Sequence, residues 1–227
     1  WMQKLPGGLI HVNVIGCALF AAISGSSAAT VATVGKMSIP ELRKRNYPEK
    51  ILLGSLAGSG TLGLLIPPSI ILIIYGVTVQ ESIAKLFIAG IIPGIMIALI
   101  FMSYVIFWSL LNKKQMPTIS TKYNFIEKIK RSGQLIPVIL LIISVIGSIY
   151  TGIATATEAA SLGVVGSLIL SYFQNSLTWI NFKNSLLGAT ITSCMISFIL
   201  AGSAFLSLAM GFTGLPRNLA IWIQNMD

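Results

Sequence analysis

Apolar runs long enough to cross a lipid bilayer dominate this sequence. The run at 83–111 is nearly uninterrupted, and others occupy residues 51–78, 135–152, 155–173 and 184–212. A helix needs about 20 predominantly apolar residues to span the hydrocarbon core. Only 9% of the residues are charged, whereas an ordinary soluble domain has about 25%. Too few polar side chains are available to coat a water-soluble globule, so the sequence predicts an all-α polytopic membrane protein.

The basic residues lie between the apolar runs. Lys and Arg number 15 against 6 Asp and Glu, which gives a formal net charge of +9. In a soluble protein this excess would suggest nucleic acid, but aromatic residues do not interleave with the basic ones in a groove-like pattern here. Lys and Arg concentrate at residues 37–50 and 112–134, which predicts that both segments are cytoplasmic. The two spans between them, 51–78 and 83–111, are the even number that this orientation needs.

The first two apolar arms are short. Residues 8–23 and 28–35 flank the tetrapeptide Ser24-Gly25-Ser26-Ser27. Neither arm comfortably spans a core of about 30 Å at about 1.5 Å per residue. The simplest interpretation is a re-entrant hairpin over residues 1–36, with its tip near 24–27, that enters and leaves on the cytoplasmic side. The alternative is one full crossing with Gly and Ser in the middle of the helix.

Hydroxyl groups gather at this tip, from Ser24, Ser26, Ser27 and Thr30 beside Gly25. Irregular backbone at membrane depth is tolerated only where it is buried in protein or lines a cavity. A helix N-terminus there favours an anion, and free carbonyls favour a cation such as Na⁺. Small-residue helix packing also enriches Gly, Ala and Ser, so the tip alone leaves binding and packing open.

A second irregular point lies inside the run 51–78. Gly58, Gly60 and Gly63 precede the segment Ile66-Pro67-Pro68-Ser69. Neither proline has an amide hydrogen, so the helix cannot run through both, and carbonyls one turn earlier lose their partners. A broken helix is the form expected of a transporter binding site near mid-membrane. The alternative is a simple proline kink.

Glu158 is the only acidic residue outside the loops, the turns and the chain end. A carboxylate in a membrane segment is costly and suggests a proton relay, a cation site or an internal pair. At the start of a span, however, Thr155 or Thr157 can cap the helix, with Glu158 in its first turn. We therefore expect a helix-start role for Thr155, Thr157 and Glu158, with a buried polar role as the alternative.

The sequence offers few residues that could form a catalytic or metal-binding site. Cys17 and Cys194 lie in apolar stretches, as inert buried thiols do, and a single histidine, His11, cannot build a metal site alone. The sequence contains no nucleophile elbow, zinc-hydrolase pattern or phosphate-binding loop. It therefore predicts no enzyme, no catalytic residue and no cofactor.

Four stretches carry a further pattern, in order along nearly the whole chain: residues 25–35, 60–76, 82–94 and 157–160. They resemble the large membrane subunit of tripartite ATP-independent periplasmic (TRAP) transporters, the first stretch its first hairpin and the second its broken helix. The resemblance implies an elevator-type transporter of the bacterial cytoplasmic membrane. Its architecture would contain two inverted repeats, each with a hairpin and a broken helix.

The resemblance also implies partners and a substrate class. In this family a Na⁺ gradient drives uptake of a carboxylate-bearing solute that a periplasmic binding protein delivers. Sialic acid, C4-dicarboxylates and related sugar acids all fit. A small membrane subunit of the Q type, separate or fused, packs beside the large one. Because the chain starts with Trp1 and shows one hairpin and one break, we expect missing sequence on both sides. The second ion site should lie beyond residue 227, and this chain should not transport alone.

Residues and resemblance together predict one site, where the hairpin tip meets the break. The Na⁺ ligands are expected to be hydroxyls and carbonyls of Ser24, Ser26, Ser27, Gly60, Gly63 and Ile66. The substrate is expected near Ser26, Thr30, Pro67 and Ser69.

The predicted organisation has five parts. They are the hairpin at 1–36, a cytoplasmic surface segment at 37–50, a broken helix plus a transmembrane helix at 51–111, a basic cytoplasmic linker or surface helix at 112–134, and further transmembrane helices leading into the second repeat at 135–227. Three alternatives stay open: a channel or scaffold subunit, a carrier similar to the divalent anion–sodium symporters that needs no binding protein, and an intramembrane enzyme completed by other sequence.

Overall fold

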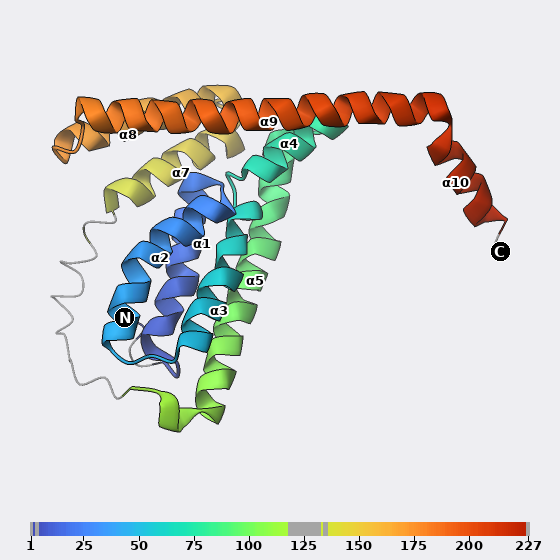
Figure 1. The fold of residues 1–227 in the computed structure, drawn as a ribbon. Helices are drawn as coiled ribbons and strands as arrows, with labels where there is room; N and C mark the ends of the chain where they lie inside the picture. The colour runs from blue at the N-terminus through green and yellow to red at the C-terminus, as the bar shows by residue number, and fades with distance from the viewer. Residues whose placement is uncertain (1, 3–4, 118–132, 134–135, 226–227) are drawn as a thin grey trace. The chain divides into compact units, whose positions relative to one another are not determined.

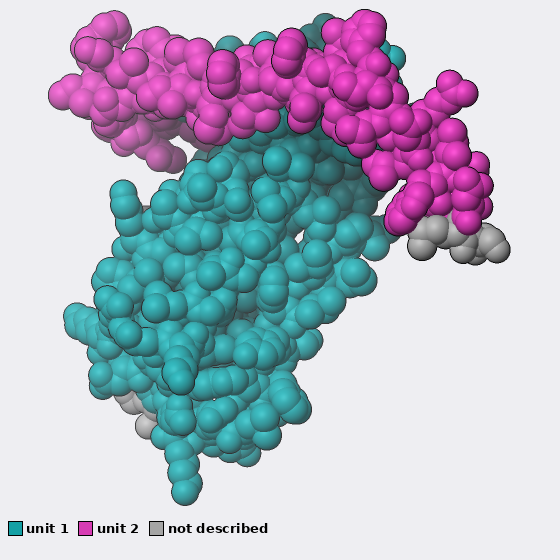
Figure 2. All heavy atoms as spheres, turned by 45° about the vertical axis from the view of Figure 1, so that its right-hand side comes forward, with its two compact units in different colours: residues 1–167 teal, residues 168–227 magenta. Residues whose placement is uncertain are grey.

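The computed structural model describes residues 2, 5–117, 133 and 136–225, and every regular element in them is helical (Figure 1). The chain divides into two units, Trp1–Ser167 and Leu168–Asp227 (Figure 2). The first unit holds η2 (Gly8–Ile10), α1 (His11–Ser24), α2 (Ser27–Lys44), α3 (Glu49–Gly60), η3 (Thr61–Leu64), α4 (Ile70–Val79), α5 (Ile83–Leu111), η4 (Lys113–Gln115), α7 (Ile136–Tyr150) and the greater part of α8 (Ala156–Phe173). The second unit holds the end of α8, α9 (Trp179–Thr213) and α10 (Leu215–Gln224).

Helices α1 and α2 form a hairpin whose turn lies in the predicted tetrapeptide (Figure 1). Gly25 ends α1 in the left-handed conformation, at φ +58°, which glycine adopts without the penalty of a β-carbon. Ser26 is extended and caps α2, because its hydroxyl accepts a hydrogen bond from the Ala29 amide at 3.4 Å. The local sequence thus stops one helix and starts the next within two residues.

The second arm is longer than expected, because α2 runs to Lys44 and not to about residue 35. Its buried residues recur every four positions, from Thr30 through Val34 and Ser38 to Leu42. This spacing keeps one face of a helix against its neighbours. The charged side chains that suggested an end to the arm lie on the exposed face, and Pro40 is accommodated within the helix.

The run 51–78 is interrupted where the two prolines stand. Helix α3 ends at Gly60, η3 adds a single tight turn, and α4 begins only at Ile70. The peptide between Pro67 and Pro68 is cis. Helix α5 follows the predicted bounds 83–111 and packs against α3, η3 and α4.

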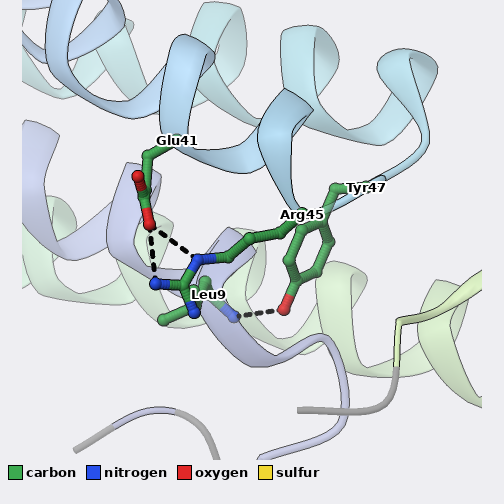
Figure 3. A network of polar contacts seen from close by, with 4 residues as sticks. All are labelled: Leu9, Glu41, Arg45 and Tyr47. Atoms are coloured by element: carbon green, nitrogen blue, oxygen red, sulfur yellow. Dashed lines mark hydrogen bonds and ion pairs between the residues drawn. The ribbon is translucent and has the colours of Figure 1, made fainter. Parts of the chain in front are cut away.

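Polar side chains make contacts at the end of the hairpin away from the tip, where α1 begins and α2 ends (Figure 3). The buried Tyr47 hydroxyl accepts a hydrogen bond from the Leu9 amide at 3.0 Å. Burial raises the pKa of the Tyr47 phenol, and the Leu9 amide and Arg45 oppose this shift. Arg45 pairs with Glu41 one turn earlier on α2, at 2.6 Å. We call these four residues the hairpin base.

Three described helices are long and apolar enough to cross a membrane: α5, α8 and α9. Shorter apolar helices cover Gly8–Ser24, Ile70–Val79 and Ile136–Tyr150. The last of these lies within the span predicted at 135–152, and its 15 described residues are fewer than the about 20 that a straight crossing needs. The predicted segment 112–134 lies largely outside the described residues, apart from its start in η4.

In the second unit, α9 begins at Trp179, five residues before the predicted start at 184. The reason is a cap: the Thr178 hydroxyl accepts a hydrogen bond from the Asn181 amide at 3.2 Å. Helix α9 ends at Thr213, and the next residue, Gly214, has φ +66° and leads directly into α10.

Candidate functional site

The hairpin tip and the helix break are in direct contact. The Ile70 amide, at the start of α4, donates a hydrogen bond to the Gly25 carbonyl at 3.2 Å. A β-carbon on Gly25 would lie 2.7 Å from the Pro68 carbonyl oxygen, and one on Gly63 would lie 2.9 Å from the Ser27 nitrogen. Two irregular backbones therefore meet at distances that only glycine permits. We call this contact the tip–break junction.

Three of the predicted hydroxyl residues form one network at the tip. The Thr30 hydroxyl donates to the Ser26 carbonyl at 2.7 Å and lies 3.0 Å from the Ser24 hydroxyl. The Ser24 hydroxyl also accepts from the Ser26 amide at 3.3 Å. Thr30 is buried, whereas Ser24 and Ser26 are partly accessible. The network fixes the oxygen atoms of the tip in place before any ligand arrives.

N-termini and C-termini of helices both lie at the junction. Helices α2 and α4 begin there, after Ser26 and Ser69, and helix N-termini carry partial positive charge. Helix α1 and the single turn η3 end there, and the last carbonyls of a helix lack intrahelical partners. An anion and a cation could therefore both be stabilised at this place without any charged side chain.

The remaining predicted ligands take different positions. The Ser69 hydroxyl is buried and donates to the Leu64 carbonyl at 2.6 Å, so it faces back into the break. Gly60 lies against α2, where a β-carbon would overlap the Val31 side chain. Ile66 packs its side chain towards Gly94 of α5. Ser27 is partly buried and lies next to Gly63 through its backbone.

A cavity of about 200 Å³ lies beside the break. Its lining is almost entirely apolar and consists of Ala22, Ile66, Pro67, Ile91, Ile95, Ile146 and Tyr150. A larger apolar groove, of about 350 Å³, lies between α1, α2 and α7 and includes none of the predicted ion or substrate residues. Of these two, the smaller cavity is the one that adjoins the break.

Two glycines of α5 belong to the site although the sequence analysis did not assign them there. A β-carbon on Gly90 would lie 2.7 Å from the Leu65 carbonyl oxygen, and one on Gly94 would lie 3.0 Å from Ile66 Cγ1. They are four positions apart, the small-xxx-small spacing that lets helices approach closely in membranes. The four-residue spacing of these two glycines is the sequence signal that could have predicted a close helix contact here.

Thr155 and Glu158 form the start of α8. The Glu158 carboxylate accepts from both the amide and the hydroxyl of Thr155 at 2.8 Å, and the Glu158 amide lies 3.3 Å from that hydroxyl. This is a capping box. These two residues and Thr157 are exposed, so the structure places all three at a helix start and not in a buried polar cluster.

Neutral oxygens are the available cation ligands at the junction. Within residues 2, 5–117, 133 and 136–225, no three His, Cys, Asp or Glu side chains gather into a possible metal site. Carbonyl and hydroxyl oxygens at unwound helices are the groups that coordinate Na⁺ in membrane carriers.

The family model described as tripartite ATP-independent periplasmic transporter, DctM component, matches residues 3–227. The chain belongs to this DctM family. The family resemblance seen in the sequence is thus confirmed, and this family is one of transporter permeases and not of enzymes.

Several DctM relatives are similar along most of the chain. The C4-dicarboxylate TRAP transporter large permease protein DctM of Pseudomonas aeruginosa is 33% identical over 223 residues, which cover 98% of this chain and 52% of that protein. The isethionate TRAP transporter permease protein DctMQ of Oleidesulfovibrio alaskensis is 34% identical, over 96% of this chain and 34% of that protein. The sialic acid TRAP transporter permease protein SiaT of Haemophilus influenzae is 35% identical, over 86% of this chain and 30% of that protein. The chain spans about half the length of the DctM permease relatives.

Proposed function

We propose that this chain forms the first ion-binding half of the membrane subunit of a Na⁺-coupled transporter. The observation that carries the proposal is the tip–break junction, where the Gly25 carbonyl and the Ile70 amide join. Carbonyl and hydroxyl oxygens there suit Na⁺, and the first turns of α2 and α4 suit a carboxylate. The Na⁺ ligands would come from Ser24, Ser26, Ser27, Gly60, Gly63 and Ile66, and the substrate would lie near Ser26, Thr30, Pro67 and Ser69.

In this proposal the hairpin is re-entrant from the cytoplasmic side. The basic residues at the ends of α2 and η4 support that side, by the excess of Lys and Arg in cytoplasmic segments. The two arms of the hairpin and the broken helix would move as part of an elevator. The second hairpin, the second break and the second ion site are expected in the rest of the protein.

The proposed cargo is a carboxylate-bearing solute such as a C4-dicarboxylate, sialic acid or a related sugar acid. Relatives carry the names C4-dicarboxylate, sialic acid and isethionate transporter, all of which denote anionic solutes. The name DctMQ of one relative supports a small Q-type membrane subunit, separate or fused. A periplasmic binding protein is the proposed donor of the solute.

The test is uptake into proteoliposomes that contain the complete transporter and its binding protein. Ser26→Ala and Ser27→Ala should each raise the Na⁺ concentration for half-maximal uptake, by roughly tenfold if one ligand interaction of about 1.4 kcal/mol is lost. Ser161→Ala is the control, since this exposed hydroxyl donates to the Thr157 carbonyl of its own helix. Unchanged Na⁺ dependence in both tip variants would refute the ion-site assignment. Current without a Na⁺ gradient would indicate a channel, and uptake without the binding protein would indicate a symporter-like carrier.

A further inference from the structure

A fully buried amide joins the first hairpin arm to the helix that leads into the break. Asn13 of α1 has no exposed surface. Its Nδ2 donates to the Leu52 carbonyl at 3.1 Å and to the Ser55 hydroxyl at 3.0 Å, both on α3. The Ser59 hydroxyl of α3 lies 3.4 Å from the backbone carbonyl oxygen of Asn13. A backbone carbonyl can only accept, so the bond to Leu52 fixes which end of the amide faces α3.

The Asn13 amide is only partly hydrogen-bonded. The Asn13 Oδ1 atom is buried and has no hydrogen-bond partner among the described residues. A buried polar atom without a partner costs free energy, and an apolar side chain of similar volume would avoid that cost. Packing alone does not explain a polar side chain at this position, whereas its two donated bonds join α1 to α3.

Those bonds set the register between two helices that run in the same direction. Helices α1 and α3 both start near the hairpin base and both end at the junction. Ser24 lies eleven positions after Asn13, and Ile66 lies eleven positions after Ser55. The Asn13–Ser55 bond therefore pairs points that are equally far, along the chain, from the tip and from the break. Slippage by one helical turn, about 5.4 Å, would separate the junction.

We propose that Asn13 is a positioning residue for the ion site. It does not touch the ion but fixes the height of the tip relative to the break. This inference rests on the proposed function, because it assumes that Na⁺ binds at the junction. Loss of the Asn13 amide should then weaken Na⁺ binding through misalignment of ligands that are themselves intact.

The experiment compares Asn13→Ala, Ser55→Ala and the double variant in proteoliposomes that contain the complete transporter. The readout is the initial uptake rate against Na⁺ concentration, at saturating solute. Asn13→Ala should raise the half-saturating Na⁺ concentration by about three- to fifteenfold, the range that interhelical hydrogen bonds in membrane proteins span. The maximal rate per folded transporter should change much less. The double variant should add little to Asn13→Ala, because the two side chains share one bond.

Leu42→Ala is the packing control. Leu42 is also buried, and the change removes as many non-hydrogen atoms as Asn13→Ala. It should lower the midpoint of thermal unfolding without moving the half-saturating Na⁺ concentration. If Asn13→Ala behaves like Leu42→Ala, the residue is structural only and the inference is wrong. If wild-type uptake does not depend on Na⁺ at all, the proposed function fails instead, so the two failures are distinguishable.

Discussion

The two ends of the hairpin are held in opposite ways. At the base, side chains make the contacts: the Tyr47 hydroxyl accepts from Leu9, and Arg45 pairs with Glu41 (Figure 3). At the tip, the backbone of Gly25 meets the backbone of α4, and glycines keep the approach open. Removing a hydroxyl or an ion pair at the base deletes one contact, whereas a β-carbon added at the tip would overlap backbone atoms. The two ends should therefore differ sharply in their tolerance of substitution.

The largest effect is expected for Gly25→Ala. The new β-carbon would meet the Pro68 carbonyl at 2.7 Å, in a residue whose φ is +58°. Left-handed strain and overpacking together cost roughly 3–5 kcal/mol, so the variant should lose Na⁺-dependent uptake and unfold at a lower temperature. Gly54→Ala is the matched control, because a β-carbon at Gly54 would have nothing within 4 Å. Equal thermal midpoints for the two variants would contradict the proposed asymmetry.

A smaller loss is expected for Gly90→Ala on α5. Its β-carbon would lie 2.7 Å from the Leu65 carbonyl oxygen, without the added strain of a positive φ. Overpacking of this kind costs about 1–3 kcal/mol, which thermal unfolding of the purified transporter can measure. Gly188→Ala on α9, where an added β-carbon would meet open space, should be neutral. A stable Gly90→Ala variant with normal Na⁺ dependence would show that α5 does not support the break.

Tyr47→Phe tests the base. The change removes the acceptor of the Leu9 amide and should cost about 1 kcal/mol. The thermal midpoint should fall slightly, and the half-saturating Na⁺ concentration should stay unchanged because the junction is at the other end of the hairpin. Tyr104→Phe is the control, since Tyr104 is exposed on α5. A shift in Na⁺ dependence for Tyr47→Phe alone would mean that the two ends are coupled.

The smallest effect is expected for Arg45→Ala. Its pair with Glu41 is partly exposed, and such pairs contribute about 0–1 kcal/mol. The effect should shrink further as salt is added. Glu49→Gln, which breaks the exposed pair with Arg43, should behave the same way in the same thermal assay. A large loss from Arg45→Ala would show that the Arg45–Glu41 pair does more than an exposed ion pair usually does.

The positions of the turn and the break could be predicted from sequence because local chemistry decides them. Gly25 supplies the positive φ, and the two prolines at 67–68 withhold the amide hydrogens that a helix needs. The bounds of α5 followed from an apolar run with a polar residue at each end. That tip and break would meet was expected only after the family resemblance was added.

What the sequence did not predict depends on contacts between distant segments. Helix α2 continues past Lys36 because Leu42 packs on the bundle, and charge alone suggested an end. In the sequence, Asn13 is one polar residue in an apolar arm. Its role as a donor to α3 depends on the packing of two helices that lie far apart along the chain. Ser69 is expected near the substrate, but the sequence did not show that its hydroxyl donates to the Leu64 carbonyl within the break. No local pattern reports which way such a hydroxyl turns.

The bond between the Gly25 carbonyl and the Ile70 amide joins positions 45 residues apart and uses no side chain. Ordinary substitutions at Ile70 other than proline would leave it intact, so a mutational scan would report this position as tolerant. The bond itself therefore does not depend on which side chain stands at position 70. Replacing the Ile70 amide by an ester linkage would delete that one hydrogen. The resulting change in the free energy of unfolding would measure how much the bond contributes.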